Sequence, residues 1–185
     1  MNKADKINIL REAKGTYNLC RCFFTYDQFY WYFYILDHSD KLLLGIEEDD
    51  FTLDGFQIRK ITDLRKIEIN DCLCPKMNEE NQLLAEVKKP EIDLSSWRAV
   101  FESLKELNCF LIVENEEMQS DDDFFHLGFI KAVKDTCVVF SSVDADGEWT
   151  EYVIIPYSKI TSVTFNDRYS KTWQKYLSKH NAIPN

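Results

Sequence analysis

The chain has few of the residues that most often build catalytic and phosphate-binding sites. Its 185 residues include only 5 glycines and 3 histidines, and no glycine-rich turn lies between a predicted strand and a predicted helix, which argues against a nucleotide-phosphate cradle. The histidines are scattered, and none has metal-ligand or triad-like spacing from a nucleophile. We therefore expect no enzyme, no cofactor and no catalytic residues. The three positions are His38, His126 and His180.

Long apolar runs are also missing. No segment approaches the roughly 18 apolar residues that a membrane-spanning helix needs, and the polar residues 1–7 do not resemble a secretory signal. We expect a cytoplasmic protein without membrane contact. In that compartment its 6 cysteines are reduced thiols rather than a disulfide framework.

Positive charge is in deficit, because 32 acidic residues outnumber 22 basic ones and give a formal charge of -10. This acidity opposes non-specific attraction to phosphate backbones and anionic lipids, so nucleic-acid binding would require a local basic patch. Apolar residues are plentiful by contrast. They make up 45% of the chain, which is enough for one ordinary domain or two small ones.

The two halves of the sequence resemble each other. A hairpin pattern with an aspartate in its turn occurs at residues 33–44, around Asp40, and again at 128–139, around Asp135. Residues 61–71 then align with 157–167, and each segment ends in Asn-Asp. This similarity favours an internal duplication over chance. The coinciding apolar positions are Leu64 with Ile160, Ile67 with Val163, and Ile69 with Phe165.

Each copy is predicted to be one helix followed by five short strands. Apolar residues recur at helical spacing from Trp97 to Leu107, and more weakly from Ile7 to Ala13. A final helix carries Tyr169, Trp173 and Leu177 on one face. Predicted strands cover residues 19–25, 29–36, 41–46, 56–61 and 66–69, then 109–113, 124–133, 136–143, 150–155 and 162–165. The expected divisions are copy one (1–74), a linker (75–92) and copy two with the C-terminal helix (93–185).

This layout, with Gly128-Phe129-Ile130 opening the second strand and an aspartate turn before the third, resembles the Sm-like variant of the SH3-type barrel. The resemblance implies a mainly β fold with helices, built from two tandem, diverged five-stranded barrels. Sm proteins usually shape an RNA pocket with a loop asparagine and an Arg-Gly or Lys-Gly step. Here the matching turns hold Asp40 and Asp135, and no glycine follows the later basic residues, so the resemblance implies the fold rather than the activity.

Two Cys-x-Cys pairs stand out, Cys20 with Cys22 and Cys72 with Cys74. Residues two apart on a strand share a face, and the first and last strands of such a barrel are neighbours, so a four-thiolate zinc site is conceivable. Structural zinc sites usually space their ligands on knuckle turns. We therefore expect small buried or half-buried thiols and no metal.

The candidate interaction surface combines aromatic and basic residues. Residues 23–34 are rich in aromatic side chains, and strand alternation places Tyr30, Tyr32 and Tyr34 on one face, as a stacking platform or a packing surface. We favour packing. The basic cluster consists of Arg59, Lys60, Arg65 and Lys66, which suits a solvated face or phosphate contact.

Three functions remain open. The first is a non-enzymatic protein-interaction module. The second is an Sm-like RNA-binding protein that uses the basic cluster. The third is an acidic, immunity-type partner that neutralises a basic toxin or nuclease, for which the acidic run at Glu114, Glu116, Glu117, Asp121, Asp122 and Asp123 offers a surface.

Overall fold

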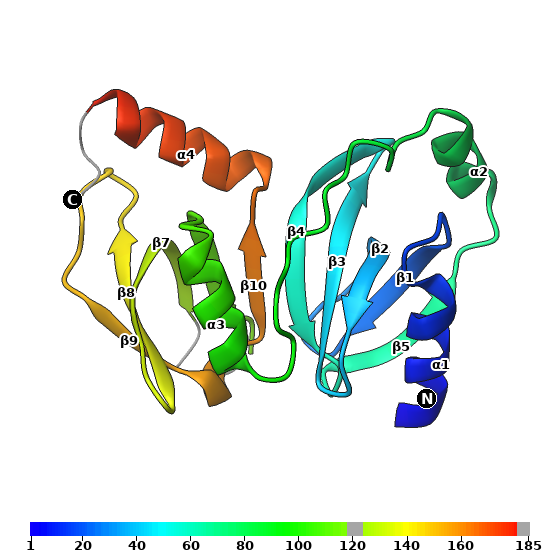
Figure 1. Cartoon of the computed structure of the whole chain (residues 1–185), viewed down its shortest axis with the longest axis horizontal. Helices are drawn as coiled ribbons and strands as arrows, with labels where there is room; N and C mark the ends of the chain where they lie inside the picture. The colour runs from blue at the N-terminus through cyan, green and yellow to red at the C-terminus, as the bar shows by residue number, and fades with distance from the viewer. Residues whose placement is uncertain (118–123, 181–185) are drawn as a thin grey trace.

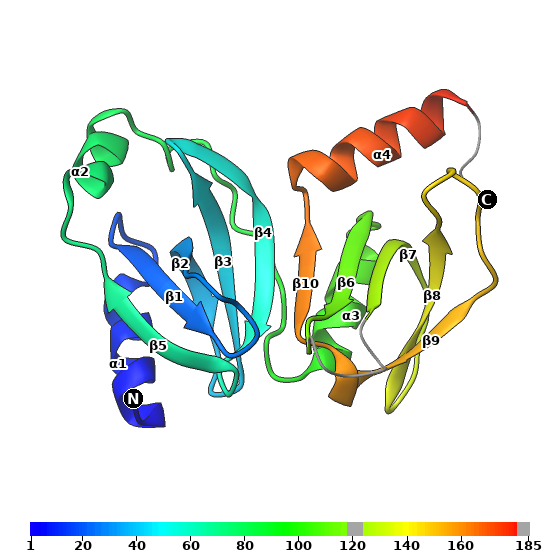
Figure 2. The same ribbon diagram turned by 180° about the vertical axis from the view of Figure 1, so that it is seen from behind.

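The protein is described by a computed structural model covering residues 1–117 and 124–180. Its strands form one antiparallel ten-stranded sheet, in the order β5-β1-β2-β3-β4-β10-β6-β7-β8-β9, and the sheet is strongly curved (Figures 1 and 2). The first half contains α1 (Lys3–Ala13), β1 (Leu19–Phe24), β2 (Trp31–His38), β3 (Leu42–Asp49), β4 (Thr52–Lys60), β5 (Leu64–Ile69) and α2 (Leu73–Glu80). The second contains α3 (Trp97–Glu106), β6 (Leu111–Asn115), β7 (Phe124–Val133), β8 (Cys137–Val143), β9 (Val153–Pro156), a 3₁₀ turn η1 (Tyr157–Lys159), β10 (Ser162–Phe165) and α4 (Arg168–Lys179).

The mainly β architecture with helices agrees with the sequence. Several element limits differ from the predicted ones; β4, for example, begins at Thr52 rather than at residue 56, and β9 begins at Val153 rather than at residue 150. β2 begins at Trp31, because the preceding residues bend and the Asp27 carboxylate accepts a 2.8 Å hydrogen bond from the Trp31 indole. The predicted linker, 75–92, is partly helical, since α2 runs to Glu80. Pro75 does not prevent this helix because it lies in the first turn, where its missing N–H would have no intrahelical partner.

The two halves join through a strand pair that is distant in sequence. β10 pairs with β4 on one side and with β6 on the other, and Val163 lies opposite Ile58 across the β4 ladder. All four β10 residues are buried. The sheet is therefore continuous across the halves, and we call the β4–β10 contact the seam.

Two large apolar clusters fill the concave faces. In the first half, Leu10 and Ala13 of α1 pack with Cys20, Phe33 and other residues of β1, β2, β3 and β5. In the second half, α3 contributes Trp97, Val100, Phe101 and Leu104 to a larger cluster. That cluster also holds three first-half residues, Leu42, Leu44 and Ile58, so α3 packs across the seam.

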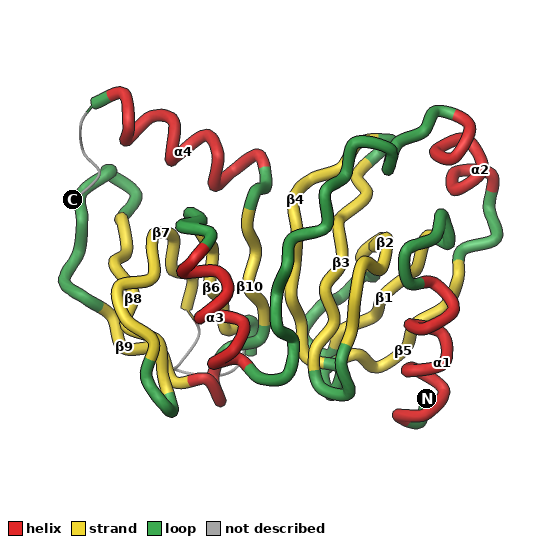
Figure 3. Tube along the Cα trace, viewed as in Figure 1, coloured by secondary structure: helices red, strands yellow, loops and turns green. Residues whose placement is uncertain are grey.

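Smaller clusters cover the outer faces. α4 places Leu177 and Trp173 against Phe110 and Leu127, while α2 and the segment after it cover Leu19 and Tyr34. Figure 3 shows α4 at the upper left, over the second half, and α2 at the upper right, beside the first half. α4 starts where Asp167 accepts a hydrogen bond from the Ser170 backbone N–H, as an N-cap does. None of the described helices has the length and hydropathy needed to cross a bilayer.

Candidate interaction surface

Strands β5, β1 and β2 present aromatic and cationic side chains on one outer face. Strand pairing sets Arg21 opposite Tyr32 and Glu68, and Phe23 opposite Lys66. Residues paired across antiparallel strands point to the same side of the sheet, so these side chains adjoin. We call this surface the aromatic–cationic patch, made of Arg21, Phe23, Tyr30, Tyr32 and Lys66; the exposed Phe29 is next to Tyr30 in the chain.

The cations of the patch lie over its rings. The Arg21 guanidinium carbon is 5.4 Å from the Tyr30 ring centroid, and its Nε donates to the Tyr32 hydroxyl at 3.4 Å. The Lys66 ammonium is 5.1 Å from the Phe23 ring centroid. These are cation–π distances, which hold the rings in place. The outermost rings are open to water, since Phe29 is 78% exposed and Tyr30 is 41% exposed.

One carboxylate moderates the charge of the patch. Glu68 forms ion pairs with Lys66 and with Arg21, the latter at 3.6 Å. Its hydrogen bond from Lys66, with the nearby positive charges, lowers the Glu68 pKa. A hydrogen bond with the Tyr30 hydroxyl, followed by burial, raises the Tyr32 pKa. At neutral pH the patch therefore carries two cations, one anion and uncharged rings.

The structure brings together only part of the predicted interaction surface. Tyr30, Tyr32 and Lys66 lie in the patch. Arg65 is exposed but donates to the Phe24 backbone oxygen at 3.0 Å, and Lys60 pairs with Asp63 at 3.2 Å. Arg21 and Phe23 of the patch, and the neighbouring Phe29, were not among the predicted surface residues. The sequence signal for Arg21 is its place two residues before Phe23 on the same strand.

Tyr34 shares the predicted face with Tyr30 and Tyr32 but is fully buried. α2 lies over it, and the Asn78 amide donates to the Tyr34 hydroxyl at 2.7 Å. Burial raises the pKa of Tyr34 to about 12. The inclusion of Tyr34 in an exposed surface was therefore wrong, because the predicted linker folds back as a helix over this part of the sheet.

Arg59 was also wrongly placed on the surface. It is 2% exposed, and it donates two hydrogen bonds to the Glu116 carboxylate at 3.0 and 2.9 Å. Its guanidinium carbon is 4.5 Å from the Phe24 ring centroid, and Asp27 lies at 3.4 Å. Arg59 therefore ties β4 of the first half to the segment after β6 of the second, inside the protein.

Glu47 lies beside this buried network and accepts a hydrogen bond from Gln57 at 3.0 Å. Burial, with the nearby carboxylates of Asp54 and Asp49, raises the pKa of Glu47 to about 7 from an ordinary 4.5. The folded protein therefore keeps a proton that the unfolded chain has already released. Stability should fall as the pH rises from about 4.5 to about 7.

We expect Glu47→Gln to remove this loss. At pH 8 the variant should be more stable than the parent by about 1–2 kcal/mol, a figure reduced for partial solvent screening, and near pH 4 the two should be equally stable. Urea unfolding across this pH interval measures the difference. Glu79→Gln, an exposed substitution on α2, is the control. If the free energy of unfolding of the parent and of Glu47→Gln changes with pH in the same way, the raised pKa of Glu47 is refuted.

The four paired cysteines lie on opposite faces of the sheet. Cys20 and Cys22 are fully buried in the concave cluster with α1, whereas Cys74 is on α2 at the outer face and Cys72 is exposed. The four sulfur atoms therefore do not come together in one site. The chain leaves the sheet at Ile69, and Cys72 caps a helix instead of extending a strand. Residues 1–117 and 124–180 contain no group of His, Cys, Asp or Glu that could hold a metal ion.

The acidic run is partly internal. Glu116 is engaged by Arg59, and the Glu114 carboxylate accepts a 2.8 Å hydrogen bond from Ser162. Burial, with the charge of Glu116, raises the Glu114 pKa. The Glu117 carboxylate accepts a 3.3 Å hydrogen bond from Tyr26. The remaining predicted members, Asp121, Asp122 and Asp123, lie outside the described residues.

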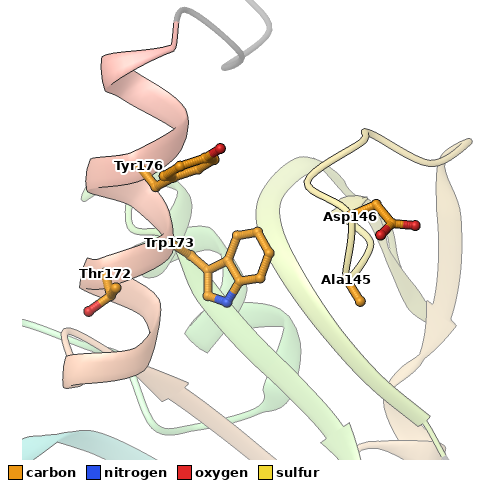
Figure 4. A pocket seen from close by; sticks show the side chains of 5 residues that line it. All are labelled: Ala145, Asp146, Thr172, Trp173 and Tyr176. Carbon is orange, nitrogen blue, oxygen red and sulfur yellow. The ribbon is translucent and has the colours of Figure 1, made fainter.

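A cleft between α4 and the turn before β9 has a volume of about 320 Å³ (Figure 4). Trp173 and Tyr176 project from α4 toward Ala145, while the Asp146 carboxylate points away from the indole. Of the described lining residues, Asp146 alone carries a charge. This lining suits apolar packing better than acid–base chemistry.

Comparison with protein-family models, curated proteins and solved structures finds no match for this chain. Its function must therefore be argued from its own residues.

Proposed function

We propose that the chain is a tandem duplication of one small Sm-like barrel and acts as a non-enzymatic module that binds another protein through the aromatic–cationic patch. The observation that carries the binding proposal is the exposed ring of Tyr30, which lies against the Arg21 guanidinium and is next in the chain to the still more exposed Phe29. Aromatic and arginine side chains of this kind dominate the energetics of protein interfaces.

Strand order supports the duplication. The first half of the sheet follows the order fifth, first, second, third and fourth strand, and the second half repeats it from β10 to β9. The aligned residues also occupy matching places. Leu64 and Ile67 lie in the concave cluster with α1, and their counterparts Ile160 and Val163 lie in the cluster with α3. α2 and α4 each follow the fifth strand and cover an outer face.

The chemistry of the patch indicates the kind of partner. Exposed ring faces favour apolar or aromatic contact, and Arg21 and Lys66 outnumber Glu68, so an acidic segment with apolar side chains fits best. The rings have few rotatable bonds and are already supported by neighbours, which lowers the entropy cost of binding.

We expect the double variant Phe29→Ala/Tyr30→Ala to lose its protein partner. Tagged protein would be used to capture material from extracts of its source cells after nuclease treatment, and the captured proteins quantified by mass spectrometry. The amount of a specific partner that is recovered should be lower by about tenfold or more with the double variant than with the parent protein. The matched control, Leu107→Ala/Tyr176→Ala, removes exposed apolar side chains elsewhere and should leave recovery unchanged. Equal recovery with all three proteins would refute the proposal.

RNA binding is the second candidate, because stacked rings beside cations also suit bases and phosphates. A short single-stranded RNA titrated at low salt tests it directly. Binding that weakens steeply with salt and disappears in Lys66→Glu would favour RNA over protein. The third candidate, neutralisation of a basic toxin or nuclease, predicts a basic captured protein whose recovery does not depend on Phe29 and Tyr30.

A further inference from the structure

β9 forms one end of the sheet and carries exposed apolar side chains. It pairs with β8, and within the described residues no strand lies on its other side. Ile154 is 66% exposed and the adjoining Tyr152 is 58% exposed. An unpaired strand edge beside apolar side chains is a template for pairing with another chain.

The corresponding position in the first half is covered. When the aspartate turns are aligned on Asp40 and Asp135, the β8–β9 pair Val139–Ile154 corresponds to the β3–β4 pair Leu44–Ile58. Ile58 is fully buried, because β10 pairs with β4 and the α3 cluster includes Ile58. The same position is thus covered by a neighbouring unit in one half and exposed in the other.

The other end of the sheet offers the complementary strand. β5 corresponds to β10 through Ile67 and Val163, and among the described strands it pairs only with β1. β10 is buried along its whole length, whereas Arg65 and Lys66 of β5 are exposed. Figure 2 shows β5 and β9 on opposite sides of the molecule, so one chain cannot pair its own two edges.

We propose that β9 of one copy pairs with β5 of a second copy in the register of the seam. Ile154 would then lie opposite Ile67, as Ile58 lies opposite Val163, and Val153 would lie opposite Glu68, as Gln57 lies opposite Thr164. The proposal rests on the duplication argued above. It does not use Phe29 or Tyr30, although β5 also carries Lys66 of the aromatic–cationic patch. Such a contact is head-to-tail, so it either closes into a ring or continues as a chain.

Pro156 does not prevent this ladder. Its counterpart in β4 is Lys60, which lies one residue beyond the four that pair with β10. The missing N–H of proline would therefore cost no bond in the new ladder.

The contact should be weaker than the seam. α3 buries Trp97, Val100, Phe101 and Leu104, whereas α1 buries only Leu10 and Ala13 and offers a narrower apolar face to a neighbour. We therefore expect association that reverses on dilution.

Sedimentation equilibrium over a wide range of concentration tests the association. The parent protein should show an average mass that rises above that of one chain, and Ile154→Lys should remain a single chain throughout, because a lysine on the edge opposes strand pairing. Leu107→Lys, another exposed apolar-to-lysine change, should associate like the parent. A parent that stays a single chain, or an Ile154→Lys variant that associates normally, would overturn the proposal.

Cysteine cross-linking tests the register. In a Cys72→Ser background, which removes the exposed native thiol, Glu68→Cys and Val153→Cys proteins are mixed and oxidised. A covalent dimer containing one of each supports the proposal, since paired strands bring Cβ atoms within disulfide reach. Cross-linking of either variant with itself, or no cross-link in the mixture, contradicts it. The Phe29→Ala/Tyr30→Ala variant should still associate, so failure here is distinguishable from failure of the proposed partner binding.

Discussion

Arg59→Met should lower the free energy of unfolding by about 3–5 kcal/mol, the usual cost of removing one member of a buried ion pair. The methionine fills a similar volume but leaves the Glu116 carboxylate without the two hydrogen bonds from Arg59, with that from Thr161 at 2.9 Å remaining, and leaves Asp27 without its nearby cation. Much of this cost comes from carboxylates that stay desolvated and unpaired. Chemical denaturation at neutral pH, monitored by tryptophan fluorescence, measures this loss in the free energy of unfolding.

Arg168→Met is the matched control. Arg168 also connects the halves, because it pairs with Asp49 at 2.6 Å and with Asp54 at 2.9 Å, but its side chain is 68% exposed. Exposed ion pairs contribute about 0–1 kcal/mol, so this variant should be nearly as stable as the parent. If the two methionine variants lose similar stability, burial does not explain the effect of Arg59.

Phe101→Ala should lower the free energy of unfolding by about 3–5 kcal/mol, the range for truncation of a fully buried phenylalanine. Phe101 is inaccessible to water, and its ring centroid is 5.9 Å from that of Tyr157 in a stacked arrangement. Its cluster includes Leu42 and Ile58 of the first half, so the cavity should weaken both halves. We expect one unfolding transition shifted to lower denaturant, seen equally by fluorescence and by circular dichroism.

Leu107→Ala, an exposed truncation at the end of the same helix, should change stability by less than about 0.5 kcal/mol. Two separate transitions in Phe101→Ala, with the first half unaffected, would show that the halves fold independently and that the seam contributes little.

Local patterns predicted most of the strands. The limits of β7 and β10 agree with the predicted 124–133 and 162–165, because both are bounded by turns and rich in residues that favour strands. α2 was missed, because Pro75 suggested a break although the first turn of a helix tolerates proline. The seam was also missed. Pairing between β4 and β10 joins residues more than a hundred positions apart, and no local pattern encodes it.

The candidate surface was predicted in part for the same reason. Alternation correctly placed Tyr30, Tyr32 and Tyr34 on one side of β2, but whether that side is open depends on α2, which covers only Tyr34. Arg59 looked exposed because Lys60 and Arg65 follow it closely in sequence. Arg59 follows Ile58 on the strand, so the two side chains point to opposite faces of the sheet. Both faces are covered at this point, and both side chains are buried.

The position of β10 has a consequence for synthesis of the protein. Of the described strands β10 is the last in sequence and so emerges from the ribosome after the others, yet it lies in the middle of the sheet between β4 and β6. Until residues 162–165 emerge, the β4 edge and the apolar side chains beside it have no cover, and at about 5–20 residues per second this lasts for several seconds. Contacts between such distant residues also slow folding. The interval before residues 162–165 emerge is therefore the time at which the uncovered β4 edge makes aggregation, and the need for chaperones, greatest.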